Sequence, residues 1–184
     1  TGTVLMKQYS ELMLARVIAC RGRVEDALAL LAPLAHSLDA NVAFGAKVFM
    51  AEAHARAGAF SLGLAHAGLV DAAPTSPYWH ALMAALARCR LALGQPAEAR
   101  ALCTRALELP HTPAPEYEAD LQVSRAEALL QLGDAVGARR ELSRAVAFTE
   151  SIARCMRDPA VRTTFLENVE AHARARVLTE QLWR

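Results

Sequence analysis

Four stretches of the chain share one pattern around a glycine: ACRGRVEDALALL (19–31), ARAGAFSLGLAHA (55–67), LALGQPAEARALC (91–103) and LQLGDAVGARREL (130–142). The four glycines stand at 22, 58, 94 and 133, so they are 36, 36 and 39 residues apart. Two other positions hold only small residues. Seven residues before the glycines stand Ala15, Ala51, Ala87 and Ala126, and five residues after them stand Ala27, Gly63, Ala99 and Ala138.

This pattern predicts a repeated helical hairpin. A glycine allows the chain to turn at the end of one helix, and a second helix then returns antiparallel to the first. The small residues fall where the two helices cross, because only a short side chain lets two helices approach closely. Aromatic residues make up only 5% of the chain, so we expect a core of small and aliphatic side chains.

The small residue, the glycine and the second small residue at these offsets resemble the tetratricopeptide repeat over residues 8–152. The resemblance implies an all-α fold, a right-handed solenoid of antiparallel helix pairs. We expect a single domain, 1–184, with repeats at about 3–39, 40–74, 76–110 and 115–157. The first residue is not Met, so we also expect the segment to be a fragment of a longer protein.

Residues 159–184 are expected to form one capping helix that closes the solenoid. Asp158-Pro159 predicts its start, since aspartate caps helices and proline suits the first helical position. Val161, Phe165, Val169, Ala173 and Val177 recur every fourth residue, so we expect this stripe to face the core and Arg174 to face away. The tail also resembles the C-terminal repeat region of large bacterial serine/threonine kinase–ATPase signalling proteins and of related ATPase-type transcription regulators. Asp158-Pro159, Arg162, Phe165-Leu166 and Ala173-Arg174 carry this resemblance.

Charge and motifs disfavour several functions. A net charge of +1 gives no field to attract nucleic acid, and no long apolar run suits a membrane span. The chain has no phosphate-binding glycine loop, dinucleotide fingerprint, zinc-protease motif or nucleophile elbow, so we expect no catalytic residues and no enzyme. Its cysteines show no paired spacing, which predicts free, buried thiols, no metal, no cofactor and a cytoplasmic location.

The resemblance implies that the first helix of each pair lines a concave groove that receives a peptide. The residues that it assigns to this groove are Tyr9, Leu12, Arg16, Val48, Glu52, Arg56, Arg88, Leu91, Asp120, Val123, Glu127, Leu130 and Gln131. Among them, Arg16, Glu52, Arg88 and Glu127 alternate in sign from repeat to repeat, and we call this series the charge ladder. The ladder either orients a bound peptide or joins neighbouring repeats through ion pairs.

We therefore expect a protein–protein interaction scaffold for signalling, which binds a peptide, a partner helix or a neighbouring domain. The alternative is a regulatory sensor domain that binds a small-molecule effector, which a deep pocket would favour. The first helix is apolar nearly all round, which predicts that something covers it. A homodimer through Leu5, Met6, Tyr9, Leu12 and Met13 is one possible cover, and a preceding repeat is the other.

Overall fold

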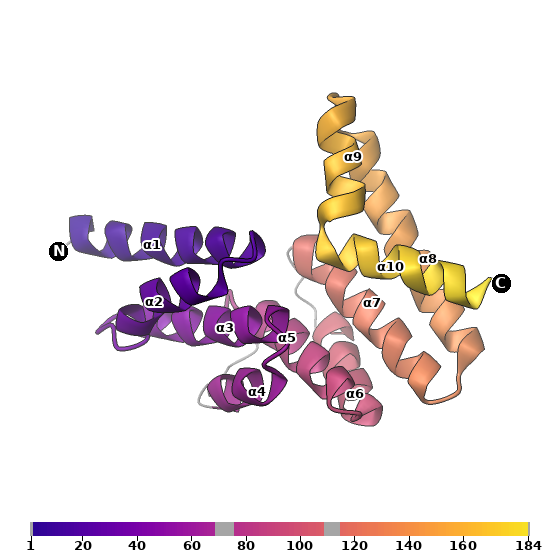
Figure 1. Cartoon of the computed structure of the whole chain (residues 1–184), viewed down its shortest axis with the longest axis horizontal. Coiled ribbons are helices and arrows are strands. Elements are labelled where there is room, and N and C mark those ends of the chain that lie inside the picture. Colours follow the sequence, from indigo (N-terminus) through magenta and orange to yellow (C-terminus); the bar gives the residue numbers. More distant parts are fainter. Residues whose placement is uncertain (1, 69–75, 109–114, 184) are drawn as a thin grey trace. The chain divides into compact units, whose positions relative to one another are not determined.

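The computed structural model describes residues 2–68, 76–108 and 115–183, and these residues fold into ten helices with no strand. The all-α prediction is thus confirmed for this part of the chain. The ends of two expected repeats, at 74 and 110, lie outside it. The helices are α1 (Gly2–Cys20), α2 (Val24–Leu34), α3 (Ala40–Arg56), α4 (Phe60–Gly68), α5 (Trp79–Ala92), α6 (Pro96–Glu108), α7 (Pro115–Gln131), α8 (Ala135–Arg154), α9 (Pro159–Asn168) and α10 (Glu170–Leu182) (Figure 1).

The four repeat glycines make the turns that the sequence predicts. Gly22, Gly58, Gly94 and Gly133 have φ angles of 80°, 75°, 72° and 83°, a region that residues with a Cβ rarely adopt. Three of these turns share one hydrogen-bond pattern, in which the amide after the glycine donates to a carbonyl five residues back. For Ala59 this bond reaches His54 at 2.9 Å, and for Asp134 it reaches Leu129 at 2.9 Å. Such bonds satisfy carbonyls that the ends of helices otherwise leave unpaired.

The small residues of the pattern lie where helices pack, as expected. All four alanines seven residues before the glycines are fully buried, and Ala27, Gly63, Ala99 and Ala138 are buried as well. In the α3–α4 hairpin, a Cβ added to Gly63 would lie 3.2 Å from the Ala51 carbonyl oxygen and 2.8 Å from Cys89 Sγ. Gly63 is therefore required for the close approach of α4 to α3.

The chain divides into two compact units, Thr1–Leu93 and Gly94–Arg184. The boundary falls inside the third expected repeat, so α5 and α6 belong to different units. In the first unit, α3 packs against α1, α2, α4 and α5. In the second unit, α7 packs against α6, α8 and α10.

The capping segment differs from the single helix expected over 159–184. Asp158 caps α9 as predicted, accepting a hydrogen bond from the Ala160 amide at 2.8 Å. The backbone then becomes extended at Val169, with φ −73° and ψ 121°, and α10 starts on a new axis. Helix α9 has no buried residue, whereas α10 packs on both α7 and α8 (Figure 1). The second helix, α10, is therefore the part that covers the hairpin.

Candidate functional site

The structure corrects the expected floor of the groove. Leu12, Val48 and Val123 have no exposed surface, and Leu91 is buried as well. Leu12 lies against α3, where a Cβ added to Gly45 would be 2.9 Å from its Cδ2 atom. Val123 belongs to the core that α7 forms with α8 and α10. Because neighbouring helices of the chain cover these side chains, a bound peptide cannot reach them without displacing a helix.

The charge ladder makes ion pairs inside each unit. In the first unit, Glu52 of α3 is buried and lies 3.5 Å from Arg16 of α1 and 2.8 Å from Arg56 of its own helix. The Arg16 guanidinium also lies over the Phe49 ring, 5.4 Å from its centroid. These contacts support the second reading of the ladder, in which its charges join neighbouring repeats. Two other expected groove residues of this unit, Tyr9 and Arg88, are half-buried.

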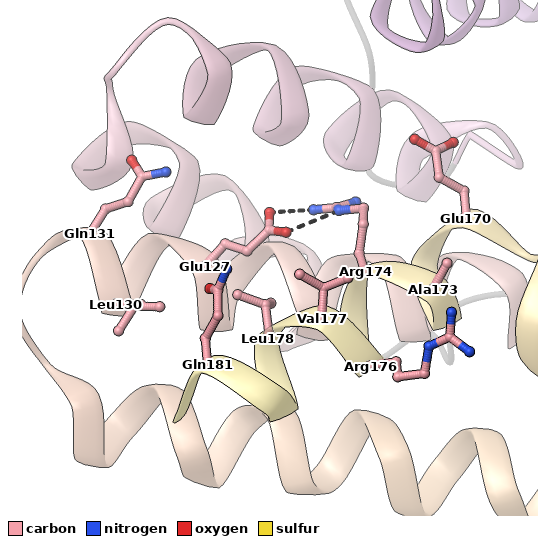
Figure 2. A pocket seen from close by; sticks show the side chains of 10 residues that line it. All are labelled: Glu127, Leu130, Gln131, Glu170, Ala173, Arg174, Arg176, Val177, Leu178 and Gln181. Carbon is pink, nitrogen blue, oxygen red and sulfur yellow. Dashed lines mark hydrogen bonds and ion pairs between the residues drawn. The ribbon is translucent and has the colours of Figure 1, made fainter. Parts of the chain in front are cut away.

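Three expected groove residues of the second unit, Glu127, Leu130 and Gln131, do line a hollow. It lies between α7 and α10 and has a volume of about 540 Å³ (Figure 2). Its other lining residues come from α10, and they are Glu170, Ala173, Arg174, Arg176, Val177, Leu178 and Gln181. Leu130, Ala173, Val177 and Leu178 supply the apolar surface, while amides and charged groups surround it. We call this site the α7–α10 hollow.

Arg174 fixes one wall of the hollow, because its guanidinium binds three side chains of α7. It donates hydrogen bonds to Asp120 Oδ1 at 2.6 Å, to Glu127 Oε1 at 3.0 Å and to Ser124 Oγ at 3.1 Å. Burial alone would lower the pKa of Arg174, but the carboxylates of Asp120 and Glu127 hold this pKa above its ordinary value. Figure 2 shows the Arg174 guanidinium directed from α10 toward the Glu127 carboxylate. These charges are satisfied within the chain, so the other polar groups around the apolar surface of the hollow are the side chains of Glu170, Arg176, Gln131 and Gln181.

The inward position of Arg174 overturns the expectation that it faces away. The expected stripe also fails, because Val161, Val169 and Val177 are exposed. The residues of α10 that pack on α7 and α8 are instead Ala175, Leu178 and Leu182. The break at Val169 explains the error, since a count in steps of four cannot be carried from one helix axis to another.

One sequence pattern could have indicated that Arg174 of α10 contacts α7. In each expected repeat, the small residue of the first helix is followed directly by a ladder charge, as in Ala15-Arg16, Ala51-Glu52, Ala87-Arg88 and Ala126-Glu127. Ala173-Arg174 continues this series, and Arg174 pairs with Glu127 as Glu52 pairs with Arg16. Arg174 thus extends the alternating charges of the ladder in sequence, and its contact with Glu127 joins α10 to α7.

Other chemical groups are few in the part of the chain that the structure describes. It contains no group of three or more His, Cys, Asp or Glu side chains that could hold a metal ion. None of its helices has the length and apolar character needed to cross a bilayer. All four cysteines are free, but only Cys89 and Cys103 are buried, so the expectation of buried thiols is wrong for Cys20 and Cys155. Burial, with a further contribution from Asp120, raises the pKa of Cys103 to about 12.

Comparison with models of known protein families, with curated proteins and with solved structures finds no match to this chain.

Proposed function

We propose that this chain is a protein–protein interaction module of the tetratricopeptide type, in which the α7–α10 hollow receives a segment of a partner polypeptide. The observation that carries the proposal is the composition of the hollow. Leu130, Val177 and Ala173 form an apolar floor, Gln131 and Gln181 stand beside it, and the inner charges are already paired. An apolar centre with a polar rim is the arrangement found at protein interfaces.

The repeated hairpin supports the tetratricopeptide part of this proposal. Four glycine turns of one conformation, each flanked by two buried small residues, are what a stack of equivalent helix pairs requires. The resemblance of the tail to bacterial kinase–ATPase proteins supports a role in a cytoplasmic signalling protein, with any catalysis in other domains. In this role the chain is a scaffold and has no catalytic centre of its own.

Peptide selection against the purified chain tests the proposal. A random-peptide phage library is selected on the chain, and the enriched peptides are synthesised and titrated by calorimetry. Val177→Asp should weaken the binding of these peptides by at least about tenfold, because it places a carboxylate in the apolar floor. The matched control is Val136→Asp, which changes an exposed valine of α8 outside the hollow. Peptides that bind both variants equally well, or a selection that enriches none, would exclude the hollow as the binding site.

A second hollow bears on the small-molecule alternative. It has a volume of about 280 Å³ and lies between α8, α9 and α10, where Val146, Leu166 and Ala175 meet Thr149, Thr179 and His172. His172 Nδ1 lies 2.7 Å from the Phe165 carbonyl oxygen, which holds the imidazole in place. This space suits only a small, largely apolar molecule. A fragment screen that shifts the NMR signals of Thr149 and His172, and not those of Val177, would favour the sensor function.

A further inference from the structure

The smaller hollow lies where α8, α9 and α10 meet, and it has a volume of about 280 Å³ (Figure 1). Each of these helices packs on the other two, so all three supply part of its lining. Val146 of α8, Leu166 of α9 and Ala175 of α10 give the hollow an apolar surface. We call this site the α8–α9–α10 hollow. It lies entirely within the second unit.

His172 of α10 brings a hydrogen-bond acceptor to this hollow. The residue is only 8% exposed, and its Nδ1 atom lies 2.7 Å from the Phe165 carbonyl oxygen. Because a carbonyl oxygen only accepts, Nδ1 carries a proton, and in the neutral imidazole Nε2 is then an acceptor. The edge-to-face contact with the Phe165 ring, at 4.5 Å between centroids, fixes the imidazole further. Nε2 itself makes no hydrogen bond with the described residues.

Thr149 of α8 adds a hydroxyl group to the same hollow. The residue is 6% exposed, and within the described part of the chain its Oγ1 atom has no hydrogen-bond partner. Thr179, which also lines the hollow, differs because its hydroxyl already donates to the Ala175 carbonyl oxygen at 2.8 Å. A buried polar group without a partner costs free energy. His172 and Thr149 therefore favour a molecule that can hydrogen-bond to them.

The charge and the size of the hollow limit what that molecule is. The lining includes one acidic residue, Glu150, and one arginine, Arg176, and both are exposed. Their opposite charges leave little to compensate a charged ligand for the hydration that it loses in an apolar space. A volume of about 280 Å³ is small for a drug-sized ligand, although an apolar cavity of about 150 Å³ can hold benzene. The occupant should therefore be uncharged and about as large as one ring.

We infer that the α8–α9–α10 hollow binds a small, uncharged molecule with a hydroxyl group, which is a phenol or a compact alcohol. The ligand hydroxyl donates to His172 Nε2 and accepts from Thr149 Oγ1, while the apolar body lies against Val146, Leu166 and Ala175. This inference rests on the sensor alternative of the proposed function and names its ligand class. Among the described lining residues, the two hollows share only Arg176, so the inference does not depend on peptide binding.

Three one-ring probes test the ligand class. Phenol carries a hydroxyl group, anisole has an oxygen that cannot donate, and benzoate is charged. In titrations followed by protein NMR, phenol should shift the signals of Thr149 and His172. It should bind about threefold to tenfold more tightly than anisole, the factor expected for one net hydrogen bond. Benzoate should bind more weakly than either, because its carboxylate would lose hydration in the hollow.

Variants of the chain test the two contacts. Thr149→Val and His172→Asn each remove one hydrogen-bonding group, and the asparagine amide keeps an N–H that can donate in place of Nδ1. Each variant should weaken phenol binding by about threefold or more and leave anisole binding within about twofold, which also shows that the variant is folded. The matched control is Thr163→Val, an exposed threonine of α9 outside the hollow, which should leave the binding of both probes unchanged.

The outcomes separate this inference from the functions proposed above. If anisole or benzoate binds at the Thr149 and His172 signals as tightly as phenol does, the sensor alternative stands and the hydroxyl class is overturned. If phenol binds equally well to the Thr149→Val and His172→Asn proteins, or if no probe shifts these signals, the inference fails. Neither result changes the outcome of the peptide selection, which depends on Val177 in the other hollow.

Discussion

Arg174 of α10 donates a hydrogen bond to Glu127 of α7, with 3.0 Å between Nε and Oε1. An equivalent contact occurs in the other unit, where Arg16 of α1 lies 3.5 Å from Glu52 of α3. All four residues directly follow an alanine, namely Ala15, Ala51, Ala126 or Ala173. Each pair connects two helices that pack on each other, with the arginine on the earlier helix in the first unit and on the later helix in the second.

Replacing Arg174 should destabilise the second unit. Arg174→Leu leaves the partly buried carboxylates of Asp120 and Glu127 without their cation, which should cost about 3 kcal/mol in the free energy of unfolding. Urea unfolding followed by circular dichroism measures this loss. The matched control is Arg176→Leu, an exposed arginine of the same helix, which should change stability by less than about 0.5 kcal/mol. Equal losses in the two variants would show that the pairing with α7 contributes nothing.

Two glycines of α4 should respond oppositely to alanine. Gly63→Ala places a Cβ 2.8 Å from Cys89 Sγ and 3.2 Å from the Ala51 carbonyl oxygen, so we expect a loss of about 1–3 kcal/mol. Gly68→Ala meets no atom within 4 Å, and it should stabilise the helix by up to about 1 kcal/mol through helix propensity. Thermal unfolding of both variants measures the contrast. A gain in both would mean that α3 and α4 do not approach closely at Gly63.

A histidine pair should make the first unit sensitive to acid. The rings of His54 and His66 stack with centroids 5.0 Å apart, and burial, followed by the charge of His66, lowers the pKa of His54 below 6.5. The unfolded chain thus takes up a proton at His54 at a higher pH than the folded chain. The contribution of neutral His54 to the free energy of unfolding is therefore complete above about pH 6.5. It is lost as the pH falls through the lower pKa that His54 has in the folded chain.

Unfolding free energies measured from pH 7.5 down to pH 5 test this dependence. His54→Gln should flatten the fall in stability between these limits, because it removes the group whose pKa differs between the two states. His36→Gln, an exposed histidine of the same unit, is the control and should leave the fall unchanged. An equally steep fall in the His54→Gln protein would assign the acid sensitivity to other groups.

Self-association through α1 remains a prediction, with a corrected set of residues. Leu12 is fully buried and cannot take part, and Leu5 and Tyr9 are half-buried, whereas Met6 and Met13 are 70% and 42% exposed. One 36-residue repeat further along the chain, Val42, Phe49 and Ala53 of α3 take the positions of Met6, Met13 and Val17, and all three are buried. An equivalent apolar contact should therefore cover this face of α1, made either by a preceding repeat or, in the isolated chain, by a second copy.

Sedimentation velocity over a concentration series measures this association. Met6→Glu with Met13→Glu should make the chain monomeric, because charged side chains then replace the exposed methionines of α1. Leu38→Glu changes an exposed leucine elsewhere in the same unit and should leave the association intact. A wild-type chain that stays monomeric at every concentration would contradict the prediction.

The helical hairpins could be predicted from sequence because their determinants are local. Glycine at the turn and small residues at the crossing act within a span of about a dozen residues, and all four turns have the expected conformation. The exposure of the groove residues could not be predicted in this way. Val48 is buried because four other helices surround α3, and that arrangement is set by packing between hairpins.

The break within the capping segment could not be predicted from the sequence for a related reason. Its apolar pattern is compatible with one continuous helix, and nothing in the local sequence marks Val169 as an extended residue. The direction of Arg174 depends on Asp120 and Glu127, which lie about 50 residues earlier in the chain. The sequence feature that connects these distant positions is an alanine followed directly by a charged residue, which occurs at Ala126-Glu127 and again at Ala173-Arg174.

The position of α10 in the chain has a consequence for synthesis in the cell. Ala175, Leu178 and Leu182 complete the core around Val123 and Leu142, yet they are translated after the whole α7–α8 hairpin. During translation, this hairpin therefore emerges from the ribosome with an apolar face exposed, and the face is covered only when α10 follows. A premature stop codon before α10 would make the exposure permanent, and chaperones and proteases would be expected to remove the shortened product.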